Sequence, residues 1–304
     1  PLLVRQLRAA LTADELRTLL KTATTSGSPA ESRLPLIAAL AGKGAFSSCM
    51  AYLEILREEI TENADLEKTA LSHLASLCSR AGQNWAAAQY YRELAVAEPE
   101  HTVHVNNLAY FLAAYMGQPE RALQLASEIL PNTHQGTQER SALLDTIGLA
   151  RLKLGDMKEA EIAFRDSLKQ HPDPLTKAHL ALLYHRENAR KKAKKIFAKA
   201  IDMAREQESP GRLKDVYDLR EETGYGPPAM DENMVLAELY MAAGQTVTAR
   251  RLLKTLTEAH ADEPAPHAKL AECLHATGRP GEAAAVLERW QERYGNEDLP
   301  PEKA

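Results

Sequence analysis

The stretch Leu144–Ala160, LDTIGLARLKLGDMKEA, decides the fold of this chain. It holds two small residues twelve positions apart, Gly148 and Ala160, with Gly155 between them and Pro172 beyond them. Two antiparallel helices approach to about 8–10 Å only where the residues at their crossing are small. A glycine between them can adopt the left-handed conformation that follows a helix end, and a proline stops the second helix. The stretch therefore predicts two antiparallel helices joined by a short turn.

The same spacing recurs along the chain. Small residues twelve positions apart also form the pairs Ala75/Ala87, Ala181/Ala193, Ala237/Ala249 and Ala271/Ala283, and the pair Ala109/Ala122 is thirteen apart. Turn-forming residues lie between the members of these pairs, namely Gly82, Gly117, Asn188, Gly244 and Gly278. The sequence therefore predicts six helix pairs, each with a small residue on both helices.

The stretch from Leu144 through Phe164 to Pro172 resembles the tetratricopeptide repeat, whose unit has about 34 residues. The resemblance covers residues 68–201 and 230–295. It implies an all-α, right-handed solenoid of stacked antiparallel helix pairs, stabilised by contacts between neighbouring pairs. Members of this family bind many unrelated partners, so the resemblance predicts a protein-protein interaction scaffold without naming its partner.

Outside the clear repeats, the pattern predicts further segments. We expect an N-terminal helical cap or linker over residues 1–30, in which Thr12 caps a helix, and a degenerate pair over residues 31–66, where Ile37 and Cys49 are twelve apart and Gly44 occupies the turn. The remaining expectations are four repeat units over 68–201, an insertion over 202–230 with one helix at 212–222, two units over 231–295 and a flexible tail over 296–304.

Composition excludes several classes of protein. Hydrophobic residues make up 44% and charged residues 26% of the chain, the net charge is -5 and the pI is about 6.1. A nucleic-acid-binding domain is usually basic, and a membrane-spanning helix needs about 18 apolar residues in a row, so we expect neither a nucleic-acid partner nor a membrane span. The three cysteines, Cys49, Cys78 and Cys273, are far apart and are predicted to be buried apolar residues. This favours the cytoplasm, or the periplasm or envelope if an N-terminal signal has been removed.

Catalytic and metal motifs are missing from the sequence. It contains no HExxH, GxSxG, GxxxxGK[ST] or GxGxxG motif. The histidine pairs His101/His104 and His267/His275 have no cysteine or carboxylate partner at ligand spacing, and His179 and His185 are six apart on a helix. We therefore expect no enzyme, no cofactor and no metal site.

The resemblance implies that the first helix of each pair lines a concave groove through its fifth, ninth and twelfth positions. The residues that we expect to contact a partner there are Asn106, Tyr110, Asp145, Leu149, Leu152, Leu182 and His185. No fifth-position residue is basic, which disfavours a clamp for a terminal carboxylate. The apolar middle suits an amphipathic helix or an apolar peptide. Alternatively, the leucines pack on neighbouring repeats or on a chain terminus folded into the groove.

Two other surfaces have alternative interpretations. The basic run 190–199 is interpreted as a solvated outer helix face or, alternatively, as a surface that binds an acidic partner or phosphates. Leu274, Leu287 and Trp290 are expected to form an apolar patch near the C-terminus that meets a second copy of the chain or a missing domain.

Two further functions remain open. The stretches Asn106–Tyr110 and Leu144–Gly148 look like paired repeats common in bacterial envelope or exopolysaccharide assembly systems. The chain could also be the sensor part of a larger enzyme whose catalytic domain is absent.

Overall fold

Helices account for all regular secondary structure in the described part of the chain. The computed structural model describes residues 2–41, 46–60, 63–207, 210–224, 230–242 and 245–294, and no strand occurs among them. None of the described helices is long and apolar enough to cross a bilayer. Contacts divide the chain into unit 1, residues 1–223, and unit 2, residues 224–304, which we describe separately.

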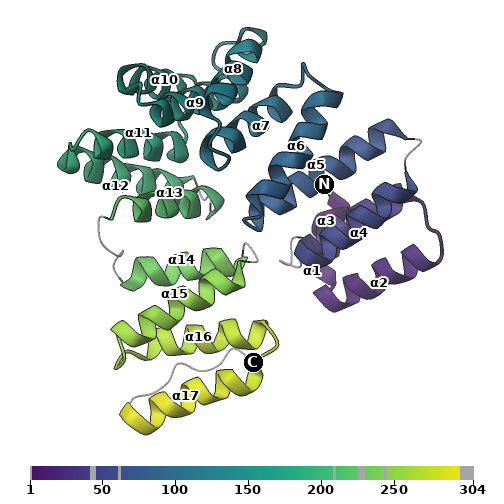
Figure 1. The fold of residues 1–304 in the computed structure, drawn as a ribbon. Helices are drawn as coiled ribbons and strands as arrows, with labels where there is room; N and C mark the ends of the chain where they lie inside the picture. Colours follow the sequence, from purple (N-terminus) through teal and green to yellow (C-terminus); the bar gives the residue numbers. More distant parts are fainter. Residues whose placement is uncertain are drawn as a thin grey trace. The chain divides into compact units, whose positions relative to one another are not determined.

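Unit 1 is a stack of antiparallel helix pairs (Figure 1). Its N-terminal helices are α1 (Leu2–Ala10), α2 (Ala13–Thr25), α3 (Ala30–Ala41) and α4 (Phe46–Glu59). They are followed by α5 (Ala64–Arg80), α6 (Asn84–Ala97), α7 (Thr102–Ala114), α8 (Pro119–Ile129) and the short 3-10 helix η1 (Leu130–Asn132). The last helices are α9 (Gln138–Leu154), α10 (Met157–Gln170), α11 (Pro174–Arg186), α12 (Arg190–Glu206) and α13 (Pro210–Glu222). The predicted all-α solenoid of stacked antiparallel pairs is confirmed.

The small residues lie where the sequence predicts them. In each of the six pairs, one small residue is on the first helix and the other is on the second, and all twelve are buried. At Gly148 the approach is closest, because a Cβ atom built there would come within 2.6 Å of the buried Phe164 ring. Glycine is therefore required at this crossing by the packing of α9 on α10.

Turns between paired helices use the left-handed conformation. Gly155 ends α9 with φ 91°, and Asn188 follows α11 with φ 60°. Asparagine tolerates this region better than most residues with a side chain, so it replaces glycine in the fourth unit of the 68–201 stretch. Gly82, Gly117 and Gly278 also have positive φ, whereas Gly44 and Gly244 lie outside the described residues.

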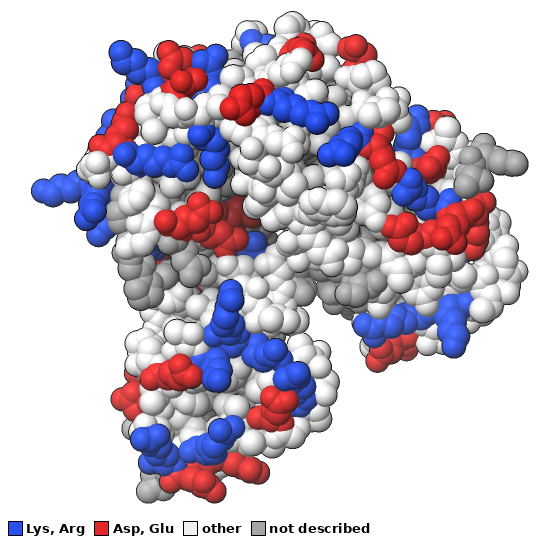
Figure 2. Space-filling view, viewed as in Figure 1, with Lys and Arg blue, Asp and Glu red and all other residues white. Residues whose placement is uncertain are grey.

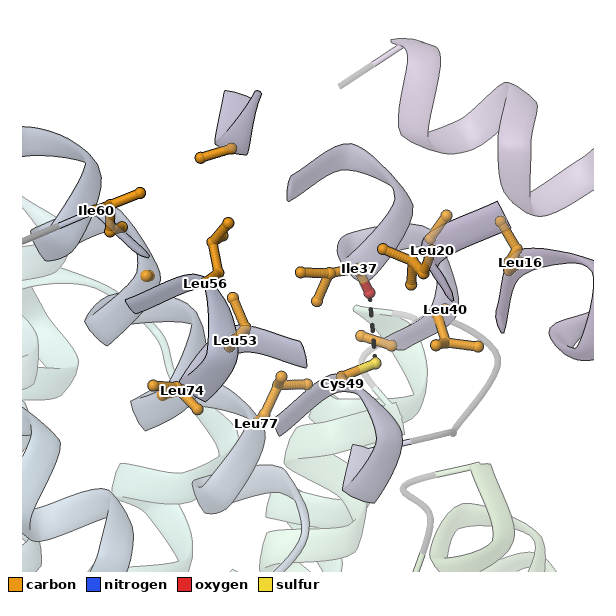
Figure 3. Packing of buried hydrophobic residues seen from close by; sticks show 14 residues of the cluster. Leu16, Leu20, Ile37, Leu40, Cys49, Leu53, Leu56, Ile60, Leu74 and Leu77 are labelled. Carbon is orange, nitrogen blue, oxygen red and sulfur yellow. Dashed lines mark hydrogen bonds between the residues drawn. The ribbon is translucent and has the colours of Figure 1, made fainter. Parts of the chain in front are cut away.

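A leucine-rich cluster joins the first four helices to α5 (Figure 3). Thr12 caps α2 in a capping box with Glu15, as its sequence position predicts. In the stretch that we expect to be a degenerate pair, α3 and α4 are antiparallel neighbours, and the Cys49 thiol donates to the Ile37 carbonyl at 3.5 Å. Burial raises the pKa of Cys49 to about 12, so this thiol is not a reactive thiolate. All three cysteines are buried and unpaired by disulfides, as predicted.

The helix expected at 212–222 is present as α13, and it packs on the preceding helix pair. Leu213, Val216 and Tyr217 are buried, and α13 lies against both α11 and α12. The first helix of a following repeat would pack in the same way, since α9 packs against α7 and α8. α13 is thus the last helix of unit 1, and it covers the apolar side of the α11–α12 pair.

Unit 2 consists of α14 (Met230–Ala242), α15 (Thr246–Ala259), α16 (Pro264–Ala276) and α17 (Pro280–Tyr294). The expectation of an apolar patch at its end is wrong for two of the three residues named, Leu274 and Trp290. Leu274 is 4% and Trp290 2% exposed, and Leu287 is half-buried. Trp290 points inward, because its ring lies 6.2 Å from that of His267 on α16. The predicted tail 296–304 lies outside the described residues.

Candidate functional site

The predicted groove residues come from the first helices of three consecutive pairs, α7, α9 and α11. Asn106, Tyr110 and His185 keep part of their surface exposed. The others are buried, with exposed fractions of 7% for Asp145, 2% for Leu149, 0% for Leu152 and 4% for Leu182. The three leucines are therefore core residues in this structure and offer no surface to a partner. Their alternative interpretation, packing against neighbouring helices, describes the structure better.

A buried hydrogen-bonded pair, His179 and Asp145, connects α9 with α11 inside this region. His179 Nδ1 lies 2.9 Å from Asp145 Oδ1 and 3.1 Å from Oδ2, and His179 is only 1% exposed. The His179 ring also stacks on Phe164 at a centroid distance of 5.7 Å and lies 6.3 Å from the Tyr110 ring. His179 is thus a structural residue. Sequence analysis missed the pair, although its 34-residue separation equals one repeat length.

α13 brings the charge of Arg212 close to residues of α7, α9 and the N-cap of α11. Arg212 Nη2 lies 3.1 Å from Asp173 Oδ2, and the Arg212 charge also acts on Asp145 and Tyr110. Burial, the neighbouring Tyr115 and the carboxylate of Asp215 raise the pKa of Tyr110. Charged residues of α13 therefore lie close enough to Tyr110 and Tyr115, near the C-terminal end of α7, to act on both phenols.

Among the predicted groove positions, those on α5 and α7 include several side chains that keep part of their surface exposed. On α5, Ser72, Ser76 and Ser79 share one helix face and are half-buried or exposed; we call them the serine row. On α7, Val103, Asn106 and Tyr110 share one helix face, and Tyr115 is the C-cap residue whose ring lies beside Tyr110; we call these four residues the α7 stripe.

The α7 stripe combines apolar surface with positioned polar groups. Val103 is 46% and Tyr115 50% exposed, and the rings of Tyr110 and Tyr115 meet edge to face at 6.1 Å. The Asn106 side-chain oxygen accepts a hydrogen bond from Thr146 at 2.9 Å, which fixes its orientation. The stripe therefore offers apolar ring and methyl surface beside one oriented amide.

Sequence analysis also missed a carboxylate beside two histidines. Glu98, His101 and His104 lie in the connection from α6 to α7 and at the start of α7, and one possible ligand atom of each lies within 4.8 Å of the others. The expectation that His101 and His104 have no carboxylate partner is wrong. The spacing Glu98-x2-His101-x2-His104 was visible in the sequence, but its geometry depends on how the chain turns at Pro99.

The basic run lies on the outer face of α12. Ala193 and Phe197 are buried, whereas Lys191, Lys195 and Lys199 are exposed. Lys192 Nζ lies 3.5 Å from the centroid of the Tyr184 ring, a cation–π contact. Figure 2 shows Lys and Arg side chains interspersed with Asp and Glu side chains over the visible face of each unit. This matches the interpretation of the run as a solvated face.

Comparison with protein families identifies the repeat. Three sequence models described as tetratricopeptide repeat match residues 143–174, 176–207 and 240–299. These ranges include the α11–α12 pair and most of the α9–α10 pair, together with the helices of unit 2 from the end of α14 onward. Among curated proteins, none matches the chain.

Several solved structures are similar in part. A thermophilic tetratricopeptide repeat protein of Thermus thermophilus, TTC0263, shares 21% identity over 64% of this chain and 97% of its own, with a TM-score of 0.46. A tetratricopeptide repeat protein from Parabacteroides merdae shares 15% identity over 96% of this chain and 94% of its own, with a TM-score of 0.42. PilF of Pseudomonas aeruginosa shares 18% identity over 86% of this chain and 99% of its own, with a TM-score of 0.43.

Proposed function

We propose that this chain, a member of the tetratricopeptide repeat family, is a non-catalytic scaffold that binds an amphipathic segment of a partner protein on the open part of the concave groove of unit 1. The binding surface consists of the α7 stripe and the serine row of α5. It replaces the apolar lining expected from the sequence, because Leu149, Leu152 and Leu182 are buried.

The observation that carries the proposal is the exposure along α7. Aromatic side chains make strong contacts in interfaces because they bury much surface at a low cost in side-chain entropy. Tyr115 and Val103 supply exposed apolar surface at the two ends of the stripe, and Asn106 supplies an oriented amide between them. A partner helix would place its apolar face on the stripe and its polar side chains against the serine hydroxyls.

α13 limits how far the partner extends. It occupies the end of the groove beside α11 and sets Asp215 near Tyr110 and Tyr115. The bound segment therefore runs along α7 and α5 and stops short of α11. The absence of a basic residue at the fifth positions argues against recognition of a terminal carboxylate, so the segment is an internal one.

Co-purification from the native source, followed by mass spectrometry, tests this proposal. Val103→Asp and Tyr115→Ala change exposed groove residues, and Lys195→Glu changes an exposed residue on the outer face of α12. We expect the two groove variants to lose a protein that the wild type and Lys195→Glu both recover, with helicity by circular dichroism unchanged. Loss of that protein from Lys195→Glu alone would move the binding surface to α12.

A further inference from the structure

The connection between α6 and α7 gathers three side chains that commonly bind metal ions. Glu98 is the C-cap residue of α6, His101 caps the N-terminus of α7, and His104 lies in the first turn of that helix. The two histidine rings stack with a centroid separation of 3.8 Å and an interplanar angle of 14°. His104 Nδ1 lies 3.2 Å from Glu98 Oε2.

We propose that Glu98, His101 and His104 bind one divalent transition-metal ion, such as Zn²⁺. In a tetrahedral site with metal–ligand bonds of about 2.0–2.2 Å, neighbouring ligand atoms lie about 3.3–3.6 Å apart. At 3.2 Å the separation of His104 Nδ1 from Glu98 Oε2 is close to this range, and all three ligand atoms lie within 4.8 Å of one another. His101 is exposed, so its ring can rotate over the remaining distance without disturbing the core.

A second observation points to a ligand at this place. His104 is 9% exposed, and its Nδ1 atom is buried without a hydrogen-bond partner although Glu98 Oε2 lies 3.2 Å away. Leaving a buried polar atom unpaired costs about 1–3 kcal/mol, so such an atom in a native protein usually has a reason. A metal ion between Nδ1 and the carboxylate oxygen satisfies both atoms at once.

The neutral imidazole is the form of histidine that binds a metal ion. Burial and the neighbouring His101 lower the pKa of His104, which disfavours its charged form. At present His101 Nδ1 accepts a long hydrogen bond of 3.4 Å from the His104 amide. This hydrogen bond is weak, so little stability is lost if His101 Nδ1 binds a metal ion instead of the His104 amide.

Lys68 on α5 holds the carboxylate in position. Its Nζ atom lies 2.9 Å from Glu98 Oε1, the oxygen that does not face His104, and 2.9 Å from Asp65 Oδ1. Glu98 therefore keeps Oε2 free for a metal ion, as carboxylate ligands fixed by outer hydrogen bonds do. Asp65 offsets the positive charge of Lys68 next to the site.

The donor set indicates which ions fit. Two imidazole nitrogens and one carboxylate oxygen favour Zn²⁺, Ni²⁺ or Cu²⁺ over Mg²⁺ and Ca²⁺, which prefer oxygen ligands. With three protein ligands, a fourth position remains for water. A bound ion would fix the end of α6 to the start of α7, at the edge of the pair that carries the α7 stripe. The site nevertheless stands independently of the proposed scaffold function.

Metal titration of the whole chain tests the proposal. Metal-free protein is titrated with zinc chloride by calorimetry and with Co²⁺ by visible absorption, which reports tetrahedral coordination. We expect one zinc ion to bind per chain, with a rise in melting temperature. The variants His101→Ala and Glu98→Gln should each weaken zinc binding by about tenfold or more and lose the tetrahedral cobalt bands.

A matched control separates this site from adventitious binding to other histidines. His134 is exposed and outside the cluster, so His134→Ala should bind zinc like the wild type. Circular dichroism of all three variants checks that they are folded. The proposal is wrong if the wild type binds no zinc at micromolar concentration, or if zinc binding and the cobalt spectrum are the same in His101→Ala and Glu98→Gln as in the wild type.

Discussion

Phe164 occupies the space that a side chain on Gly148 would need. A Cβ atom at position 148 would lie 2.6 Å from both Cδ1 and Cε1 of the Phe164 ring, and Phe164 is fully buried. Such a contact is much shorter than the separation of about 3.5–4.0 Å that carbon atoms prefer. The α9–α10 crossing is therefore closed to any residue larger than glycine unless the ring or the helices move.

Gly148→Ala should destabilise unit 1 by about 1–3 kcal/mol, because overpacking outweighs the better helix propensity of alanine. Gly211→Ala is the control, since a Cβ atom there meets nothing within 4 Å. Urea unfolding followed by circular dichroism measures both. A Gly148→Ala variant as stable as Gly211→Ala would show that the crossing is looser than described.

Asp145→Ala should cost about 1–3 kcal/mol, because it leaves the His179 ring buried without its hydrogen-bond partner. Asp145→Asn keeps an oxygen acceptor for the imidazole and should recover most of this loss. Together with the two single variants, the double variant Asp145→Ala/His179→Ala completes a double-mutant cycle that gives the coupling energy between Asp145 and His179. If the cycle gives no coupling energy, Asp145 and His179 do not stabilise each other in solution.

Much of the fold follows from the sequence because its determinants are local. The small pairs such as Ala75/Ala87 and the turn residues Gly155 and Asn188 act within one repeat, so their spacing predicts the helices directly. The presence of α13 was predictable for the same reason.

The accessibility of the groove was not predictable in this way. Whether Leu149 and Leu182 are exposed depends on how successive pairs rotate and on where α13 packs, and no single repeat encodes either. The same holds for Trp290, whose helix turns it toward His267. The cluster at Glu98 depends on the path of the chain at Pro99, between two helices. Contacts that span repeats or loops are thus the part that sequence spacing leaves undetermined.

Acid should lower the stability of unit 1 by protonating the Glu59 carboxylate. The hydrogen bond from the buried Arg33 side chain lowers the pKa of Glu59 below its usual value of 4.5. Since the pKa is lower in the folded state, this contribution to stability is complete above the unfolded-state pKa and is lost as the pH falls through the folded-state pKa.

In the Glu59→Gln variant, the stability of unit 1 should therefore fall less steeply than in the wild type as the pH is lowered. The control is Glu58→Gln, which changes the adjacent exposed glutamate. Thermal melts between about pH 3 and 7 span the titration of carboxyl groups and check this. Equal acid dependence in Glu59→Gln and the wild type would contradict a role for the Arg33–Glu59 pair.

α13 should stabilise the helices that it covers. Tyr217 is 1% exposed, and its hydroxyl accepts a hydrogen bond from Arg205 at 3.1 Å. Tyr217→Ala should cost about 3–5 kcal/mol, whereas Tyr217→Phe keeps the ring and should cost about 1 kcal/mol. Hydrogen exchange reports which amides lose protection. Unchanged protection of α11 and α12 in Tyr217→Ala would show that α13 does not pack on them in solution.

Site-specific photocrosslinking tests the central claim, that the open concave groove of unit 1 binds the partner, most directly. A photoreactive amino acid is placed at Val103 or Ser76 in the groove, and at Lys195 on the outer face of α12, in separate preparations exposed to the native partner mixture. We predict the same crosslinked protein from positions 103 and 76, with its crosslinked peptide an amphipathic internal segment, and none of it from position 195. Crosslinks to that protein from position 195, with positions 103 and 76 silent, would contradict binding in the groove.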